Sequence, residues 1–300
     1  MIFMLCIVGI SSADSYFLNL KVADLGLNNS YTLIKLVFAL FFILLLFYLS
    51  GDKVKALALI TSPLVIAVFY RHGFDFFSLF PCLALISKKS DWISAMILAI
   101  SIFLYFWVKE ISILFTILFV IAFISLKQKI WIVSILSILF LALMYFFLPL
   151  ELLMDIQGSV IKKITATEYT HVKNSDFSIY KAFVVYLLSH SYFIFNNNVT
   201  VAFAGLTCLP IVFLTLYNFL RRAPKNEIFL SFFIYIFTTS FFKTFQHLRI
   251  YPFLYFNYFN YLSRRDCYIL VWINVVTLLL HQFIFLYLDP DKNSIFLVFF

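Results

Sequence analysis

The sequence predicts an all-α fold: a polytopic transmembrane bundle of about ten helices, within a range of roughly nine to twelve. Hydrophobic residues make up 64% of the 300 residues, against 22 Lys and Arg and 14 Asp and Glu, and the mean hydropathy is +1.03. Soluble chains are about 45 to 50% apolar and about 25% charged, so the excess apolar surface must face lipid. Residues 1–300 are therefore expected to form a single integral membrane domain.

Eight apolar runs are long enough to cross a hydrocarbon layer of about 30 Å. They cover residues 31–49, 54–70, 92–108, 111–126, 130–150, 199–220, 228–242 and 267–288. Three shorter runs, 1–10, 76–87 and 250–262, are interpreted as tilted or partial spans. Another short run, 182–195, contains His190 and precedes three asparagines, which suits a helix in the membrane interface.

The distribution of Lys and Arg selects the threading. If the three shorter runs cross the membrane and 182–195 does not, eleven of the 22 basic residues fall in five short loops on one side. Cytoplasmic loops carry an excess of Lys and Arg, so this side is predicted to be cytoplasmic. Residues 11–30, 71–75, 109–110, 243–249, the C-terminus and a long loop at 151–198 are then predicted to lie outside. The basic residues are Lys53, Lys55, Lys88, Lys89, Lys127, Lys129, Arg221, Arg222, Lys225, Arg264 and Arg265.

Residues 1–10 allow a second interpretation. An apolar stretch followed by Ser11, Ser12 and Ala13 also resembles the core of a signal peptide. No basic residue precedes the stretch, and signal peptides begin with a basic region, so a first span is the preferred interpretation.

Composition and motifs exclude several classes of protein. The basic residues are spread through short loops and are explained by topology, so no nucleic-acid partner is expected. GxGxxG, GxxxxGK[ST], HExxH and GxSxG motifs are all missing, so no nucleotide cofactor and no metal are predicted. The cysteines show no metal-ligand spacing and are interpreted as core residues; they are Cys6, Cys82, Cys208 and Cys267.

Two polar clusters on the predicted outer side are candidate binding sites. Arg71 and Asp75 flank Gly73 between apolar runs, close enough to pair with each other or to hold a ligand. Lys243, His247 and Arg249 form a second cluster before Pro252. Arg binds phosphate oxygens with a planar fork, and His accepts a proton near neutral pH. The alternative for the first cluster is a capped turn in which Arg71 extends from the interface to water, and for the second it is ordinary loop charges near the lipid headgroups.

The long outer loop offers a third candidate. It contains Tyr169, His171 and Tyr180, and its charges sum to zero between residues 151 and 181, so it does not attract ligands by net charge. Long loops in otherwise tightly connected chains are often functional lids, and disorder is the alternative. His281 in the last run is expected to make a hydrogen bond between helices, with a substrate role as the alternative.

These features together resemble a known family. About ten spans, one sizeable outer loop past the middle, an R-x-G-x-D-like turn (Arg71, Gly73, Asp75) and the basic run at 247–250 are similar to bacterial oligosaccharide repeat-unit polymerases. These are the Wzy-type, EpsG-like enzymes of O-antigen, capsule and exopolysaccharide assembly. The resemblance is architectural over most of the chain and extends to motifs only near residues 71–75 and 249.

The resemblance implies a membrane glycosyltransferase of the bacterial inner membrane. Its substrate would be a glycan linked through pyrophosphate to a polyprenyl lipid, which carries its own leaving group and explains why no cofactor is needed. Arg71, Arg249 and Lys243 would hold the pyrophosphate, and His247 or Asp75 would act as the base. Tyr169, His171 and Tyr180 would line the sugar site. Membrane lipid, a flippase and a chain-length regulator are the implied partners.

Two other classes stay open. A flippase or other secondary transporter would use the same arginines without a base and is often built from internal repeats, of which none is visible by eye. A scaffold protein of the membrane would need none of the outer polar residues.

Overall fold

The computed structural model describes residues 30–70, 75–89, 91–108, 111–128, 179–188, 191, 199–242 and 247–287, with short pieces between 135 and 146. Among these residues helices dominate and no strand occurs, which confirms the all-α prediction. The longer helices are α3 (Ser30–Ser50), α7 (Asp91–Val108), α8 (Ile111–Gln128), α12 (Val199–Arg222), α13 (Lys225–Phe242), α14 (His247–Phe259) and α15 (Arg264–Tyr287). The shorter ones are α4 (Lys53–Ile60), α5 (Pro63–Tyr70), the 3-10 helix η1 (Asp75–Ser78), α6 (Leu79–Ile86) and α11 (Ile179–Leu188).

Most predicted apolar runs correspond to a helix. The runs at 31–49, 92–108, 111–126, 199–220, 228–242 and 267–288 match α3, α7, α8, α12, α13 and α15 to within a few residues. The run at 1–10 and most of the run at 130–150 lie outside the described residues. In the described part, one helix, Ala202–Arg222, is long and apolar enough to cross a membrane by length and composition. A buried helix of a soluble protein meets the same criteria, so the number of spans stays a prediction.

The run at 54–70 forms two helices rather than one. Pro63 has no backbone N–H and cannot continue the hydrogen-bond ladder of α4. The Thr61 hydroxyl instead donates to the carbonyl oxygens of Leu57 (2.9 Å) and Ala58 (3.3 Å). From α15, Asn274 Nδ2 donates to the Ala58 carbonyl at 2.9 Å. At the break between these two short helices, a side chain from a third helix thus provides a hydrogen bond to a backbone carbonyl.

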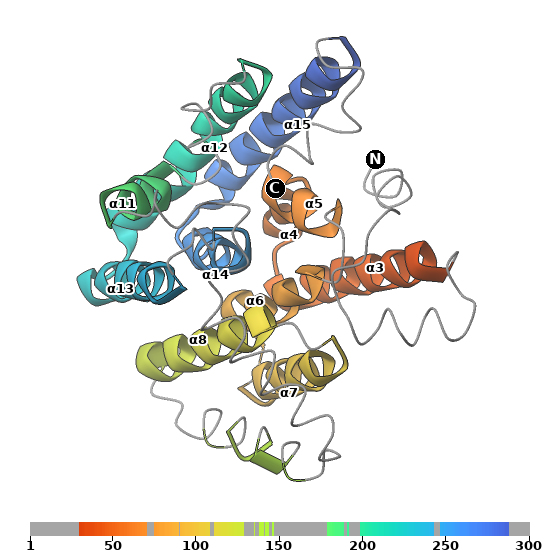
Figure 1. Ribbon diagram of the computed structural model, residues 1–300, viewed down its shortest axis with the longest axis vertical. Helices are drawn as coiled ribbons and strands as arrows, with labels where there is room; N and C mark the ends of the chain where they lie inside the picture. Colours follow the sequence, from red (N-terminus) through yellow and green to blue (C-terminus); the bar gives the residue numbers. More distant parts are fainter. Residues whose placement is uncertain are drawn as a thin grey trace.

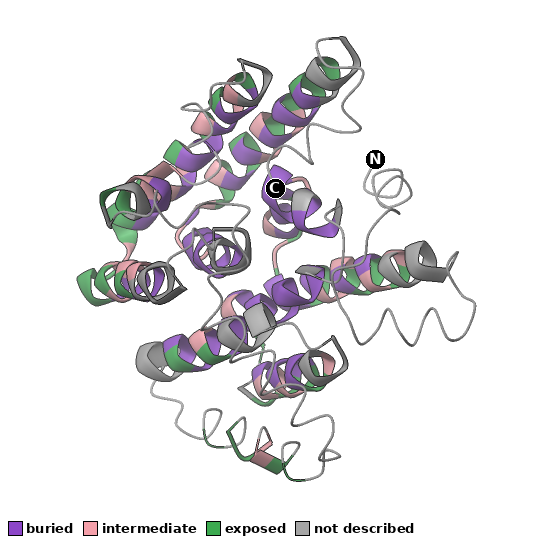
Figure 2. Cartoon of the chain, in the orientation of Figure 1, coloured by how far each residue is buried: buried purple, intermediate pink, exposed green. Residues whose placement is uncertain are grey.

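Helix α14 occupies the centre of the described bundle. It contacts α12 on one side and α6, α8, α5 and η1 on the other (Figure 1). Every residue from 252 to 259 is buried, as is most of α6, whereas α3, α12 and α15 each have an exposed face (Figure 2). The start of α14 therefore leads directly into a segment that is buried throughout.

Aromatic rings fix η1 against its neighbours. Phe76 in η1 stacks on Phe69 of α5 with 5.4 Å between the ring centroids, and Phe77 meets Phe38 of α3 edge to face at 4.8 Å. Phe76 and Phe77 are almost completely buried. Offset and edge-to-face ring pairs stabilise by about 0.5 to 1.5 kcal/mol beyond their buried area. Asp75, the first residue of η1, is thereby held at a defined place beside α14.

Four of the five predicted cytoplasmic loops lie together, in what we call the basic end: residues 50–55, 86–89, 221–225 and 259–266. Hydrogen bonds join them in a chain. These bonds run from Lys88 N to Leu49 O (3.0 Å), from Asn260 Nδ2 to Leu85 O (3.0 Å), from Lys55 Nζ to Phe259 O (3.1 Å) and from Arg222 Nη1 to Tyr261 O (2.8 Å). The threading predicted that these loops share one side, and the structure brings them together.

Local sequence explains one of these loops, at residues 50–55. Gly51 follows α3 with φ of +61°, a left-handed conformation that glycine adopts readily and that ends many helices. Asp52 then caps α4, accepting hydrogen bonds from the N–H groups of Val54 (2.9 Å) and Lys55 (3.4 Å). A helix end and a helix start are thus encoded within three residues.

The helix expected in the interface at 182–195 is described from 179 to 188, as α11. It packs on α13, where the Tyr186 hydroxyl lies 3.0 Å from Ser231 Oγ in a buried position. Tyr186 and Val185 belong to the hydrophobic core. In the described part, this helix therefore packs against the bundle along one face.

Candidate functional site

The directions of α6 and α14 follow from their contacts at the basic end. Leu85, at the end of α6, accepts a hydrogen bond from Asn260, which follows the end of α14. Both helices therefore run toward the basic end, and α14 also contacts η1, which precedes α6. Their starts lie at the opposite end of the pair, which we call the distal end: residues 75–79 and 247–250.

The length of helix between this hydrogen bond and each candidate residue can be compared. From Leu85 to Asp75 there is about 17 Å of helix, at about 1.5 Å per residue in α6 and about 2.0 Å in η1. From Asn260 to Arg249 there is also about 17 Å, because eleven residues rise by about 1.5 Å each. Asp75 and Arg249 thus lie similar lengths of helix from this hydrogen bond, on elements that contact each other.

The two predicted outer clusters come from elements in contact. In the chain, residues 71–74 come between α5 and η1, and both of these elements contact α14. Residues 243–246 come between α13 and α14 in the chain. The start of α14 carries His247 at its first position and Arg249 in its first turn. The sequence predicted only that these clusters share one side of a membrane, and the structure adds that η1 and α5 contact α14.

Not all predicted site residues can be placed. Arg71, Lys243, Tyr169 and His171 lie outside the described residues. For Asp75, His247 and Arg249 the structure gives the backbone position in η1 and α14. Tyr180 is described fully: it lies in the first turn of α11 with 76% of its surface exposed. An exposed tyrosine is available to a ligand, but no described contact directs it toward the distal end.

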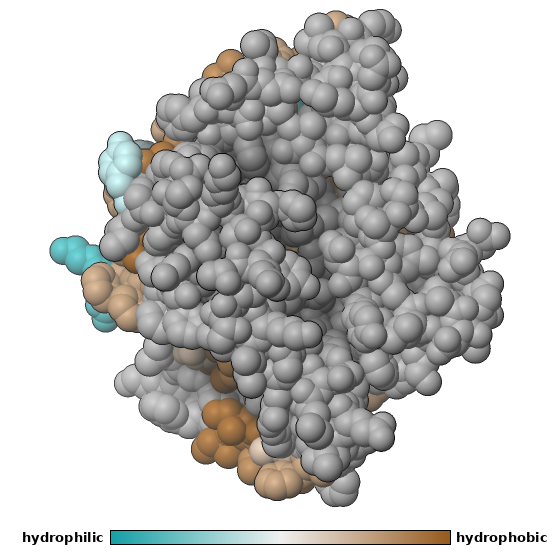
Figure 3. Space-filling model, viewed as in Figure 1, coloured by the Kyte–Doolittle hydropathy of each residue, from teal (hydrophilic) through white to brown (hydrophobic). Residues whose placement is uncertain are grey.

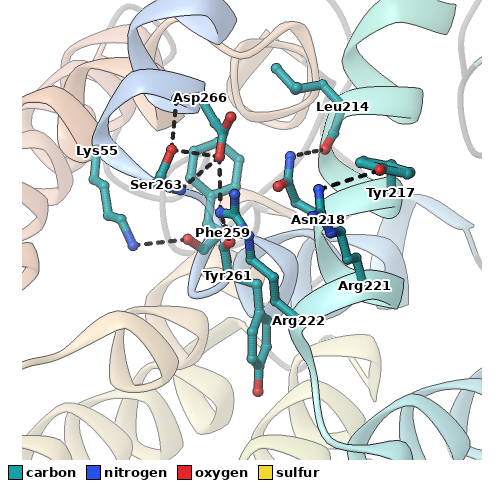
Figure 4. Close-up of polar contacts among 10 residues, drawn as sticks. All are labelled: Lys55, Leu214, Tyr217, Asn218, Arg221, Arg222, Phe259, Tyr261, Ser263 and Asp266. Carbon is teal, nitrogen blue, oxygen red and sulfur yellow. Dashed lines mark hydrogen bonds and ion pairs between the residues drawn. The ribbon is translucent and has the colours of Figure 1, made fainter.

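The charges at the basic end form a network that ties three helices together (Figure 4). Arg222 Nη1 at the end of α12 lies 3.0 Å from Asp266 Oδ2 in α15. Ser263 and Asp266 cap α15 reciprocally: the hydroxyl and N–H of Ser263 donate to Asp266 Oδ2 (2.6 and 2.9 Å), and the Asp266 N–H donates back at 3.2 Å. In α13, Glu227 accepts a hydrogen bond from the Tyr261 hydroxyl.

The ionisation of Asp266 reflects this network. Partial burial raises the pKa of its carboxyl, but the hydrogen bonds from Ser263, followed by the hydrogen bond and charge of Arg222, outweigh burial. The pKa of Asp266 is therefore held below the ordinary value for aspartate. The carboxylate is ionised at neutral pH and keeps Arg222 in place.

Polar side chains of α15 face the interior of the bundle. Asn274, Thr277 and His281 are buried, one or two turns apart on one face of the helix. His281 Nε2 lies 2.8 Å from Thr207 Oγ1 of α12, and Thr277 donates to the Thr207 carbonyl at 3.1 Å. The expected hydrogen bond of His281 between helices is confirmed. Asn274 was not identified as a candidate from the sequence. The pattern that could have pointed to it is the break at Thr61-Ser62-Pro63, because a carbonyl left open there needs a hydrogen-bond donor from another helix.

No group of three or more His, Cys, Asp and Glu side chains suited to a metal occurs among the described residues. Comparison of the chain with protein-family models, curated proteins and solved structures found no match. Function must therefore be argued from the placement of residues in this structure and from the sequence features given above.

Proposed function

We propose that this chain is a multi-pass protein of the bacterial inner membrane that polymerises polyprenyl-pyrophosphate-linked oligosaccharide repeat units at the outer face. The observation that carries the proposal is the contact of η1, which begins at Asp75, with α14, whose first turn contains Arg249. A base and cations at this end would suit a reaction in which a pyrophosphate is the leaving group.

Membrane placement is supported by the outward faces of the helices. On α15, large side chains at positions 268, 272, 276, 279 and 283 are exposed, with 71% exposure for Trp272, whereas Asn274 and His281 are buried. On α3, Leu44 is 67% exposed. Apolar side chains also reach the lower and left edges of the surface (Figure 3). Apolar residues outside and polar residues inside are typical of helices that face lipid.

The start of α14 suits an anion. The first N–H groups of a helix have no partner within the helix, and the helix dipole places positive charge at this end. Arg249 adds a full charge in the first turn, and Arg71 and Lys243 come from the chain segments that lead into η1 and α14. Pyrophosphate oxygens are accepted by this combination of backbone N–H groups and guanidinium forks.

The reaction requires one proton acceptor. In the proposed step His247, or Asp75 in its place, takes the proton of an acceptor sugar hydroxyl while that oxygen attacks the anomeric carbon. The bond from the anomeric carbon to the pyrophosphate oxygen breaks, and polyprenyl pyrophosphate leaves as an anion bound by Arg71, Arg249 and Lys243. Tyr169, His171 and Tyr180 contribute to the sugar site in this proposal.

The test compares variants at the start of α14 in cells that make the polymer. His247→Ala should leave the protein in the membrane but stop chain extension, with single repeat units still reaching the cell surface. Arg249→Lys keeps the charge and removes the fork, so it should reduce extension strongly. The matched control is Asn226→Ala, an exposed position in the first turn of α13. Normal polymer length in both His247→Ala and Arg249→Lys would refute the proposal.

One observation favours the flippase alternative. The break between α4 and α5, held by Asn274, is a discontinuous helix of the kind that transporters use at binding sites. A flippase defect would leave the lipid-linked unit facing the cytoplasm, whereas a polymerase defect leaves single units outside. The location of the unextended repeat unit in the Arg249→Lys strain therefore separates the two functions, because both would use this arginine.

A further inference from the structure

Acidic side chains at the basic end are used within the protein. Asp52 caps α4, Asp266 caps α15 and pairs with Arg222, and Glu227, which is 8% exposed, accepts the hydrogen bond of Tyr261. Each of these three carboxylates therefore already has a partner within the bundle.

Most basic side chains at this end, in contrast, have no carboxylate partner among the described residues. Seven basic side chains at this end are exposed and pair with no carboxylate among the described residues. They are Lys53, Lys88, Lys89, Arg221, Lys225, Arg264 and Arg265. They come from the loops or helix ends of α3–α4, α6–α7, α12–α13 and α14–α15, which hydrogen bonds hold together. Folding thus gathers exposed cations from distant parts of the chain at one end, without a carboxylate partner among the side chains that the structure describes.

Tyrosines line the apolar side of these cations. Lys89 Nζ lies 4.6 Å from the ring centroid of Tyr48 in α3, and Arg221 Nη1 lies 3.5 Å from the Tyr217 hydroxyl one turn earlier in α12. In α15, Tyr268 follows Arg264 by one turn. We call these three residues the tyrosine belt; they are 56%, 58% and 51% exposed in chain order.

The same layers recur at α3, α12 and α15. Moving toward the basic end, an exposed apolar residue is followed by a belt tyrosine and then by a cation, which belongs to the same helix in α12 and α15 and is Lys89 of the α6–α7 loop at α3. The exposed apolar residues are Leu44 in α3, Phe213 in α12 and Trp272 in α15, each one turn from its tyrosine. Tyrosine prefers the headgroup level of a bilayer, where its ring is apolar and its hydroxyl is hydrated, and Lys and Arg prefer the phosphate level.

We propose that the basic end, with its tyrosine belt, is a binding surface for anionic phospholipid headgroups. The inference rests on the proposed membrane placement but not on the polymerase reaction. Phosphate oxygens would accept hydrogen bonds from the unpaired cations, the glycerol region would contact the tyrosines, and acyl chains would cover the apolar residues. A nucleic acid or an acidic soluble protein would satisfy the cations but leave the apolar residues in water, so a lipid fits the layered surface better.

The test uses the purified full chain without any glycan substrate. The protein is placed in nanodiscs with equal amounts of phosphatidylglycerol and phosphatidylcholine, and the lipids that stay bound after release into detergent are counted by native mass spectrometry. The wild-type protein should retain phosphatidylglycerol preferentially. The variant R221Q/R264Q/R265Q should lose about fivefold in this preference for each cation removed.

Two matched variants make the result decisive. R221K/R264K/R265K keeps the charges and should keep the preference. K162Q/K163Q/K173Q removes the same number of charges from the long loop and should also keep it. Folding of each variant is checked by circular dichroism and size-exclusion chromatography. No lipid preference in the wild type, or equal loss in both Gln variants, would overturn the proposal. Because no glycan is present, failure of chain extension cannot produce either outcome.

Discussion

Asn274 is predicted to stabilise the break between α4 and α5, and its removal gives a quantitative test. The side chain is completely buried, and its Nδ2 donates to the Ala58 carbonyl at 2.9 Å and to Thr61 Oγ1 at 3.3 Å. Asn274→Ala removes both hydrogen bonds. The Ala58 carbonyl then keeps only the longer hydrogen bond from the Thr61 hydroxyl.

The expected loss follows from these contacts. A hydrogen bond between helices in a membrane stabilises by about 0.6 kcal/mol on average and about 1.7 kcal/mol at most. A buried carbonyl left poorly satisfied adds about 1 kcal/mol or more. We expect the free energy of unfolding to fall by about 2 kcal/mol, which corresponds to a Tm lower by roughly 4 to 8 °C at the scale of a large domain.

Thermal unfolding in detergent micelles measures this change, with Asn226→Ala as the matched control at an exposed position. The control should stay within about 0.5 kcal/mol of the wild type. A second variant sharpens the result: Thr61→Val removes the remaining donor to Ala58, so the double variant should lose about 1 kcal/mol more than the sum of the single changes. Equal Tm values for Asn274→Ala and Asn226→Ala, or strict additivity, would refute the proposed role.

Other predictions concern the ion pair, the arginine turn and the α11 contact. Because the pKa of Asp266 is lowered in the folded protein, its contribution to stability is complete above about pH 4 and is lost as the pH falls through the folded-state pKa. Asp266→Asn should therefore lower Tm at pH 7, in part by loosening Arg222, and the difference from wild type should shrink below pH 4 in a pH series of melts. Arg71→Lys should reduce chain extension in cells while keeping protein levels; full activity would remove Arg71 from the site. Tyr186→Phe removes the bond to Ser231 and should destabilise by about 1 kcal/mol in thermal melts, whereas no change would show that the bond contributes nothing.

Helix positions were largely predictable from the sequence. The ends of apolar runs such as those of α3 and α12 are marked by nearby residues. Gly51 predicts the end of α3, and the arginines at 221–222 predict the end of α12. The break at Pro63 was visible as a residue type, but hydropathy alone joined α4 and α5 into one run. Whether such a Pro kinks or divides a helix depends on an outside donor, here Asn274, which is more than two hundred residues away.

The candidate site was predictable only in part. Charge distribution predicted that Arg71, Asp75, His247 and Arg249 share one side, because the positive-inside rule fixes sides from local counts of Lys and Arg. It could not predict that η1 and α14 are neighbours, since a contact between elements so far apart in the chain leaves no pattern in the local sequence. The basic loops were interpreted only as topology signals. Their hydrogen bonds, such as Arg222 to Tyr261, come from tertiary structure and leave no local pattern.

Cross-linking tests most directly whether Asp75 and Arg249 meet at the distal end. In a chain with its natural cysteines replaced by serine, D75C/R249C should be joined by a bismaleimide that spans about 8 to 10 Å, the usual distance between packed helices. D75C/K89C, which pairs the distal end with the basic end, should not be joined. Efficient cross-linking of the first pair alone is the predicted result. Failure of that pair, or equal cross-linking of both, would contradict the shared site on which the proposed function depends.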